Sequence, residues 1–307
     1  MDVSIVTTMY RSARYLDEFY RRVSAAVRQI TEDYEIVFVN DGSPDDSLDV
    51  ALALYARDRR VRVVDLSRNF GHHKAMMTGL ACARGELVFL IDCDLEVAPE
   101  TLGVFYQTFQ DAQVDVVYGV RESRQDPILD RLAGRLFYVI FNWLSTDALP
   151  VNLVTARLMS RRYVSALVSH REREVLIGGL WVITGFEQAP MVVHKTCKKS
   201  STYTIGRRVA VLVNAITSFS NKPLVFIFYL GCVISLVAGL WALYLIVRRV
   251  FFGVFLAGWP SLIVSVWLLG GIIIFCLGVL GIYMSKIFVE TKQRPYTIIR
   301  QVHEDGG

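Results

Sequence analysis

The sequence has little of several features that define common protein classes. Its 307 residues include five cysteines, whose spacing matches neither a zinc site nor a CxxC redox pair, so we expect reduced, structural thiols. A net charge of +4 is too small to indicate a nucleic-acid-binding protein. No Gly-x-Gly-x-x-Gly follows the first strand-like run, which argues against a nicotinamide dehydrogenase. No leader pattern opens the chain, so we expect a cytoplasmic N-terminal domain.

Long apolar runs are abundant, and they collect after Pro223. The run 224–247 carries no charged residue, and neither does the run 250–285. Because about 20 apolar residues cross a bilayer, the first run predicts one transmembrane helix, and the second predicts a loop and a helix at about 261–283. Lys and Arg flank both ends of this hairpin, with only two arginines between the spans. The positive-inside rule therefore places both termini in the cytoplasm.

The hairpin divides the chain into four predicted parts. These are a cytoplasmic domain at 1–204, a juxtamembrane amphipathic helix at 205–222, two transmembrane helices at 223–286 and a cytoplasmic tail at 287–307. Within the first part, residues 128–144 carry apolar side chains at helical spacing, with basic residues elsewhere on the helix. This pattern is typical both of a helix lying at a membrane interface and of an ordinary core-facing helix.

Strand-like and helix-like patterns alternate through the N-terminal part. The strand-like runs are 3–8, 34–40, 61–65, 87–91 and 114–119. Such alternation predicts an α/β fold with a mainly parallel sheet covered by helices on both faces. Ligands of these sheets bind beyond the carboxyl ends of the strands, which is where Asp41 and Asp92 follow the second and fourth runs.

Acidic and basic motifs at these strand ends carry the candidate chemistry. Asp92-Cys93-Asp94 follows LVFLI, and its paired carboxylates suit Mg²⁺ or Mn²⁺, which would neutralise charge on a departing diphosphate. Asp41, in VNDGSPDDS, can accept hydrogen bonds from a base or a ribose, or can simply order a turn. The loop RNFGHHK precedes a helix whose N-terminus could face an anion. Its two histidines lack ligand-like neighbours in sequence, so we do not expect them to bind metal.

Taken together and in order, these motifs resemble those of the family 2 glycosyltransferases, which have a Rossmann-like nucleotide-sugar fold of the GT-A type. The matching segments cover nearly the whole chain: VNDGSPDDS, SRNFGHHKAMMTGL, LIDCDLEVAPE, VYGVRESR, RLMSRR and GIYMSKIFVETKQRPYTI. The chain is most similar to bacterial polyprenyl-phosphate hexose transferases, relatives of the dolichyl-phosphate mannose synthases. This resemblance implies a metal-dependent, inverting transferase of the inner membrane. Its donor would be a nucleotide sugar, a UDP-sugar foremost, and its acceptor polyprenyl (undecaprenyl) phosphate among membrane lipids.

The resemblance also implies roles for matching positions. The residues implied to hold the metal are Asp92, Asp94 and Glu96. Those implied to bind the nucleotide sugar are Thr8, Tyr10, Asp41, Ser201 and Tyr203. Arg121 is implied to meet phosphate, and catalysis would fall to Asp92, Asp94 and Arg121. In the basic amphipathic run 128–144, Arg131 and Arg135 are further candidates to guide the lipid phosphate.

Three departures from the family pattern leave the donor sugar open. Thr8 stands where the family usually has Pro, Thr155 where it often has Asp, and Thr202 where it has Lys. The missing acid at Thr155 is compatible with a lipid phosphate acceptor. A phosphate monoester ionises near pH 6 and needs no general base, unlike a sugar hydroxyl.

Two other functions compete with this one. A processive polysaccharide synthase would carry a Gln-x-x-Arg-Trp motif, but Ala-Pro-Met follows Gln188. A degenerate, non-catalytic nucleotide-sugar-binding protein would explain the departures, although the retained aspartates argue against it. The oligomeric state stays open, and a homo-oligomer is compatible with the sequence.

Overall fold

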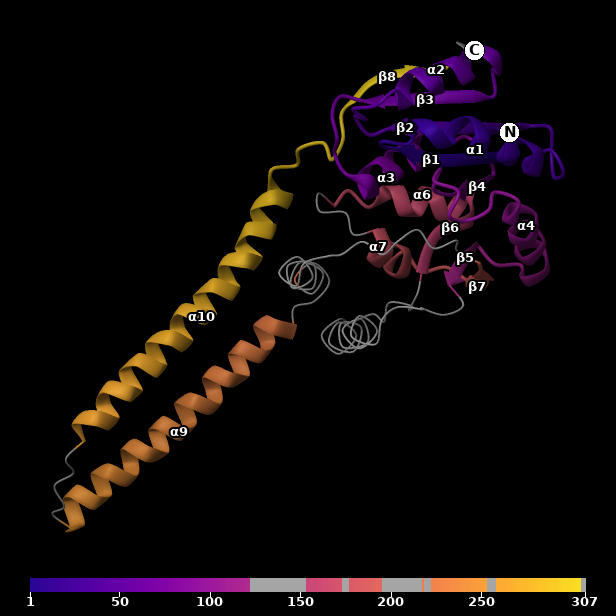
Figure 1. The fold of residues 1–307 in the computed structure, drawn as a ribbon. Helices are drawn as coiled ribbons and strands as arrows, with labels where there is room; N and C mark the ends of the chain where they lie inside the picture. Colours follow the sequence, from indigo (N-terminus) through magenta and orange to yellow (C-terminus); the bar gives the residue numbers. More distant parts are fainter. Residues whose placement is uncertain (122–152, 173–176, 195–216, 218–221, 253–257, 305–307) are drawn as a thin grey trace. The chain divides into compact units, whose positions relative to one another are not determined.

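The computed structural model describes residues 1–121, 153–172, 177–194, 217, 222–252 and 258–304 (Figure 1). The helix expected at 128–144 and nearly all of the one expected at 205–222 lie outside these residues. The described chain forms two compact units. One unit contains the N-terminal α/β part together with the C-terminal residues from Arg294, and the other contains the two long apolar helices.

All five strands expected in the N-terminal part are present, and three more join them. The strands are β1 (Val3–Met9), β2 (Tyr34–Asn40), β3 (Val61–Leu66), β4 (Leu87–Leu90), β5 (Val116–Arg121), β6 (Leu153–Ser160), β7 (Gln188–Val193) and β8 (Ile299–His303). The helices of this unit are α1 (Ala13–Val27), α2 (Ser47–Arg57), α3 (His72–Cys82), α4 (Thr101–Ala112), α6 (Arg161–Ser169) and α7 (Ile177–Ile183).

The strands form one mixed sheet in the order β7-β5-β6-β4-β1-β2-β3-β8 (Figure 1). The expected parallel arrangement holds for β1 to β4, whereas β6 and β8 run antiparallel to their neighbours. Because β4 and β5 are both antiparallel to β6, they run in the same direction as each other. The carboxyl ends of β1 to β5 therefore meet at one edge of the sheet, as ligand binding in α/β folds requires.

Helices cover both faces of the sheet, as the buried strands predict. On one face α1, α2 and α4 pack in a core where Phe19 meets Phe38 at a ring-centroid distance of 6.0 Å, and Phe89 meets Phe105 at 5.4 Å. On the other face, α3, α6 and α7 pack against the side chains that alternate with these along the same strands. Side chains alternate between the two faces of a strand, and each face of this sheet packs against an apolar core. The central strands therefore have no face exposed to water.

The C-terminal segment, expected from the sequence to be a tail, contributes a strand to the edge of this sheet. Strand β8 pairs antiparallel with β3, and the Ser67 N–H donates to the Ile298 carbonyl at 2.9 Å. Glu304 forms ion pairs with Arg62 and with Arg84, the latter at 2.8 Å, and Arg62 also pairs with buried Glu35 at 2.7 Å. Strand β8 thereby covers the edge of β3, whose N–H and C=O groups would otherwise be unpaired.

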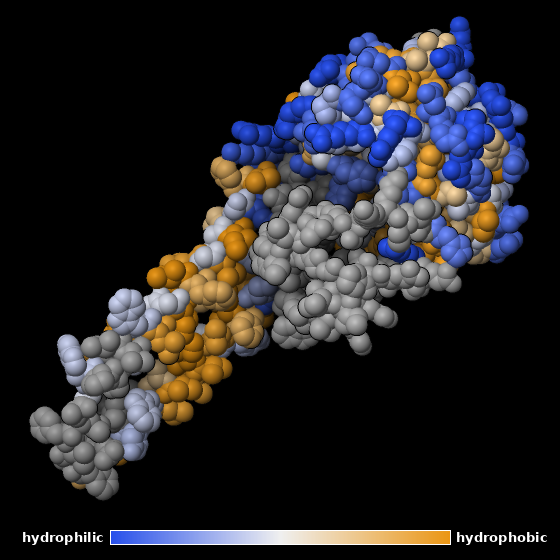
Figure 2. All heavy atoms as spheres, in the orientation of Figure 1, coloured by the Kyte–Doolittle hydropathy of each residue, from blue (hydrophilic) through white to orange (hydrophobic). Residues whose placement is uncertain are grey.

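The second unit consists of α9 (Lys222–Phe252) and α10 (Trp259–Thr291). Each contains a stretch that is long and apolar enough to span a membrane, Lys222–Trp241 and Ser265–Thr291. Large apolar side chains lie exposed along both helices, as Figure 2 shows; Phe228 is 65% exposed and Trp267 is 80% exposed. A water-soluble surface rarely carries a continuous apolar band of this kind, so the two helices are candidate membrane spans, as expected.

Candidate functional site

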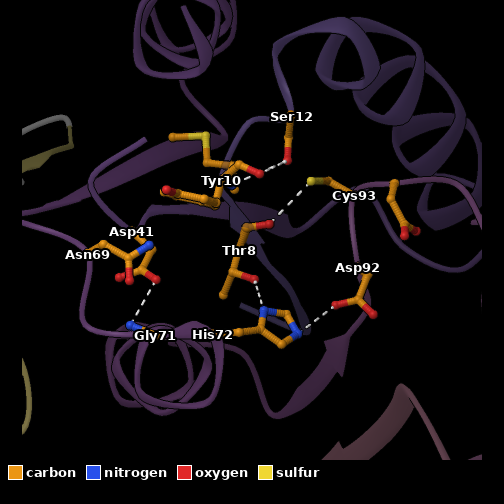
Figure 3. A pocket seen from close by; sticks show the side chains of 11 residues that line it. Thr8, Tyr10, Ser12, Asp41, Asn69, Gly71, His72, Asp92 and Cys93 are labelled. Carbon is orange, nitrogen blue, oxygen red and sulfur yellow. Dashed lines mark hydrogen bonds and ion pairs between the residues drawn. The ribbon is translucent and has the colours of Figure 1, made fainter. Parts of the chain in front are cut away.

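A pocket of about 450 Å³ opens at the carboxyl-end edge of the sheet (Figure 3). It is lined by the residues that follow β1, β2 and β4 and by the loop that leads into α3. The predicted site residues Thr8, Tyr10, Asp41, Asp92 and Asp94 all line it. Its size lies within the range of pockets that enclose small ligands. Four segments far apart in sequence thus meet where the parallel strands end.

Asp41, one wall of the pocket, is tied to the loop before α3. One carboxylate oxygen accepts a hydrogen bond from the Phe70 N–H at 2.7 Å, and the other accepts from the Gly71 N–H at 3.0 Å. Only 2% of Asp41 is exposed. Burial raises the pKa of its carboxyl, and the two backbone hydrogen bonds and nearby cations oppose that rise. Asp41 therefore orders the pocket wall, and any nucleoside contact would use its remaining lone pairs.

Two glycines allow this close approach of the loops. Gly42 has φ +59°, and a Cβ there would lie 2.4 Å from the Arg68 carbonyl carbon and 2.5 Å from the Asn69 nitrogen. Gly71, with φ +99°, occupies the N-cap position of α3. Residues with side chains rarely adopt such φ values, so glycine suits both positions. The glycine of the turn in VNDGSPDDS is thus needed for packing.

Asp92 and Asp94 form the opposite wall. The Glu96 N–H donates to Asp94 at 3.0 Å, and between them Leu95 adopts a left-handed φ of +60°. Such backbone strain is common where a functional side chain must be held in place. Beneath them, the Cys93 thiol donates to the Thr8 carbonyl at 3.2 Å, and burial raises its pKa to about 11. This thiol therefore stays protonated and structural, as expected.

The two wall carboxylates fit a divalent cation that is shared with a bound phosphate group. Within the described part of the chain, no group of three or more His, Cys, Asp or Glu side chains could hold a metal alone. Mg²⁺ is commonly held by one or two carboxylates plus substrate phosphates, while retaining some of its water. Asp92 and Asp94 supply such a pair. Glu96 contributes its backbone N–H to Asp94, and its expected place as a third ligand remains a prediction.

His72 is the pocket residue that the sequence pattern did not identify as important. Its Nδ1 lies 2.9 Å from the Thr8 hydroxyl, and its Nε2 lies 3.3 Å from an Asp92 carboxylate oxygen. Figure 3 shows the imidazole between these two side chains. Its partners are 64 and 20 residues away in the sequence, so only the packing of α3 beside β1 and β4 brings them together. The one sequence feature that could have indicated this contact is Thr8 itself. It provides a hydroxyl where the family usually has proline, and proline has no side-chain group that could bond to His72.

The remaining predicted residues fall in two groups. Arg121 ends β5 at the same edge of the sheet as Asp92, although it is not among the residues that line the pocket. Its strand position is compatible with the expected phosphate role but does not establish it. Four residues lie outside the described part of the chain, and their predicted roles remain predictions: Arg131, Arg135, Ser201 and Tyr203.

Strand β6 carries the segment that departs from the family pattern. Arg157 pairs with Leu90 in the sheet register, so Thr155 lies two residues closer to the site edge. The Arg157 side chain is fully buried, with its guanidinium carbon 3.0 Å from the centre of the Trp181 ring. By strict distance and angle, none of its nitrogens has a hydrogen-bond partner among the described residues. Burial lowers its pKa to about 9, and the nearby Tyr163 hydroxyl opposes this fall. Arg157 thus supports the site edge from below through stacking rather than through an ion pair.

Comparison with known proteins gives relatives along nearly the whole chain. A Mycobacterium tuberculosis protein described as a glycosyltransferase is 55% identical over 99% of this chain and 89% of its own length. The prophage bactoprenol glucosyl transferase homolog of Escherichia coli is 32% identical over 98% of this chain and 99% of its own. The bactoprenol glucosyl transferase of Shigella phage SfV is also 32% identical, over 98% of both chains.

Solved structures share the fold. The glucosyl-3-phosphoglycerate synthase of Mycobacterium tuberculosis, in complex with phosphoglyceric acid, has a TM-score of 0.51 at 17% identity, over 71% of this chain and 79% of that chain. The mannosyltransferase PcManGT of Pyrobaculum calidifontis, in complex with GDP-Man and Mn²⁺, has a TM-score of 0.50 at 18% identity. The match covers 69% of this chain and 62% of that chain. The sequence signature of glycosyl transferase family 2 matches residues 4–167. With this match over more than half of its length and relatives aligned along nearly all of it, the chain belongs to glycosyl transferase family 2.

Proposed function

We propose that this protein transfers a sugar, with inversion, from a nucleotide-sugar donor to a polyprenyl phosphate in a divalent-metal-dependent reaction. The observation that carries the proposal is the pocket, where Asp41 faces Asp92 and Asp94 across the carboxyl ends of parallel strands. Several relatives are bactoprenol glucosyl transferases by name, which supports the same reaction. A UDP-sugar is the donor we expect first.

On the donor side, each wall of the pocket has a separate task. Asp41 orders the loop 69–71, and Tyr10, which is 44% exposed, offers an aromatic ring to a nucleoside base. Asp92 and Asp94 would hold Mg²⁺ or Mn²⁺, which supplies charge neutralisation for the departing diphosphate. The two carboxylates keep their position because one follows a buried strand and the other accepts the Glu96 N–H.

On the acceptor side, the proposal needs a site that aligns a phosphate and needs no general base. A phosphate monoester is largely ionised at neutral pH and is itself the nucleophile. Thr155 stands near the site edge where related enzymes often have a carboxylate, which is compatible with such an acceptor. Arg121 is the described cation whose strand ends at this edge. Arg131 and Arg135 are proposed to guide the lipid phosphate toward it.

The membrane arrangement follows from the order of the chain. The first unit precedes α9, and the chain returns to the same sheet as β8 after α10. An even number of crossings is required if both segments lie on one side of a membrane. This supports a hairpin of two spans in the inner membrane, with the catalytic domain and both termini in the cytoplasm. Reporter fusions at Gly307 and near Gly258 should then report opposite sides, and agreement between them would contradict the hairpin.

A transfer assay tests the reaction. Purified full-length protein is offered a panel of labelled nucleotide sugars with undecaprenyl phosphate, polyprenol or soluble sugars as acceptors. We expect label in an organic-extractable, mild-acid-labile product from undecaprenyl phosphate alone, and none in excess chelator. Preferred transfer to polyprenol or a free sugar would contradict the lipid phosphate acceptor. A water-soluble polymer would favour a processive synthase, and absence of any transfer would favour a binding protein.

The acceptor side has its own test. The double variant Arg131→Glu, Arg135→Glu should raise the apparent Michaelis constant for undecaprenyl phosphate much more than that for the donor. The reason is that acidic side chains would repel the lipid phosphate without touching the donor pocket. An equal rise for both substrates would argue against a specific role in lipid binding.

A further inference from the structure

We propose that His72 is a positioning residue that orients the Asp92 carboxylate for metal binding, and that the Thr8 hydroxyl orients His72. This inference rests on the proposed function, since it assumes that Asp92 holds a divalent cation. It adds two residues of this chain to the metal site without making either a metal ligand. Figure 3 shows the His72 ring joined to the Thr8 hydroxyl on one side and to the Asp92 carboxylate on the other.

The geometry requires a proton on the ring nitrogen that faces Asp92. The Asp92 carboxylate can only accept, and it lies 3.3 Å from Nε2, so Nε2 must donate. The Nδ1 atom of the neutral ring then accepts from the Thr8 hydroxyl, 2.9 Å away. Both ring nitrogens are engaged in this arrangement, which leaves neither for a metal. The polar chain therefore runs in one direction, from Thr8 through His72 to Asp92.

The consequence of this chain is a carboxylate held in one orientation. A carboxylate at a strand end can rotate about two side-chain bonds, and fixing it on metal binding costs conformational entropy. The contact of His72 Nε2 with one oxygen, at 3.3 Å, restricts that rotation beforehand. Hydrogen-bond partners of metal ligands are typically worth about 10- to 100-fold in metal affinity or activity. His72 is half exposed, so the restriction comes from this pair of contacts rather than from tight packing.

Isosteric substitutions separate the two contacts. The amide nitrogen of glutamine matches the position of Nε2, so His72→Gln keeps a donor for Asp92. The amide group of asparagine matches Nδ1, so His72→Asn keeps a partner for Thr8 and loses the donor. Thr8→Val removes the hydroxyl with little change in shape. His73→Asn makes the same change one residue further along α3 and serves as the matched control.

The measurement is Mn²⁺ affinity of the full-length, detergent-solubilised protein in the presence of UDP, from the electron paramagnetic resonance signal of free Mn²⁺. We expect His72→Asn to weaken Mn²⁺ binding by about 10- to 100-fold. His72→Gln and His73→Asn should bind close to the wild type, and Thr8→Val should show a smaller loss than His72→Asn. Turnover of His72→Asn should recover at saturating Mn²⁺, because Asp92 itself is intact. Unchanged circular dichroism spectra verify folding.

Each contrary outcome identifies its cause. Wild-type affinity in His72→Asn would overturn the role of His72, and equal losses in the Asn and Gln variants would show that ring volume matters rather than the donor. A loss of turnover that saturating Mn²⁺ does not restore would mean that His72 acts on the substrate instead. Absence of Mn²⁺ binding in the wild-type protein with UDP would instead contradict the metal dependence in the proposed function.

Discussion

Replacing Gly42 with alanine tests how the pocket wall is built. The new Cβ would lie 2.4 Å and 2.5 Å from two backbone atoms of Arg68 and Asn69, which no side-chain rotation can relieve. The left-handed φ of +59° adds about 1 kcal/mol for a residue with a Cβ. Any shift of this loop also lengthens the bonds from Phe70 and Gly71 to Asp41, each worth about 1.5–3 kcal/mol because the acceptor is charged. With partial relaxation, we expect Gly42→Ala to lower the free energy of unfolding by about 3 kcal/mol.

The control is another glycine-to-alanine change in the same domain. Gly103 lies inside α4, and nothing is within 4 Å of the position that its Cβ would take. Gly103→Ala should therefore raise stability by about 0.5–1 kcal/mol through helix propensity. Chemical denaturation in detergent, followed by tryptophan fluorescence, measures both variants, and titration with UDP measures the pocket. Equal stability of Gly42→Ala and the wild type, with unchanged UDP affinity, would refute the reasoning.

Three further predictions concern the site and its support. Asp94→Asn should reduce turnover at least about 100-fold, or on the order of 3 kcal/mol, with unchanged stability; full activity in excess chelator would contradict this. Burial raises the pKa of Asp45, but hydrogen bonds from Ser43, Ser47 and the Ala13 N–H lower it to about 2 from the ordinary 3.8. The stabilisation from the ionised Asp45 carboxylate is therefore complete above about pH 4 and is lost as the pH falls toward 2. The Asp45→Asn variant should be less stable than the wild type at pH 7, and its free energy of unfolding should fall less steeply between about pH 4 and pH 2. Arg157→Met should raise the free energy of unfolding by about 1–2 kcal/mol, because a buried cation without a carboxylate partner costs more than its contacts with Trp181 and Tyr163 return. A loss of more than 2 kcal/mol would show that the guanidinium has a partner, and thermal and urea unfolding measure it.

The main features of the site follow from local sequence. Asp41 and Asp92 come directly after apolar runs, and parallel strands bring their carboxyl ends to one edge. The DxD pair and the turn at Gly42 are therefore predictable from the order of residue types along the chain. The two candidate membrane spans are predictable for the same reason, since length and the absence of charge are local properties.

Other features depend on contacts between distant segments. The predicted division of the chain missed β8, because Ile299–His303 has the pattern of a short polar strand and only its pairing with β3 reveals it. The antiparallel place of β6 between β4 and β5 is equally invisible in the pattern of side chains. The His72 contacts were missed because a histidine shows no partner in its own neighbourhood of the sequence.

For this protein, the sequence alone determined the class of fold, the two candidate membrane spans and the acidic residues at the strand ends. These depend on hydrophobic periodicity and on residue type, which act over a few residues. The tertiary structure decided that Asp41 orders a loop, that Thr8, His72 and Asp92 form one polar chain, and that the C-terminal strand completes the sheet. Each of these depends on a hydrogen bond or ion pair whose two ends are distant in the chain. Such bonds form only after packing has brought their ends together.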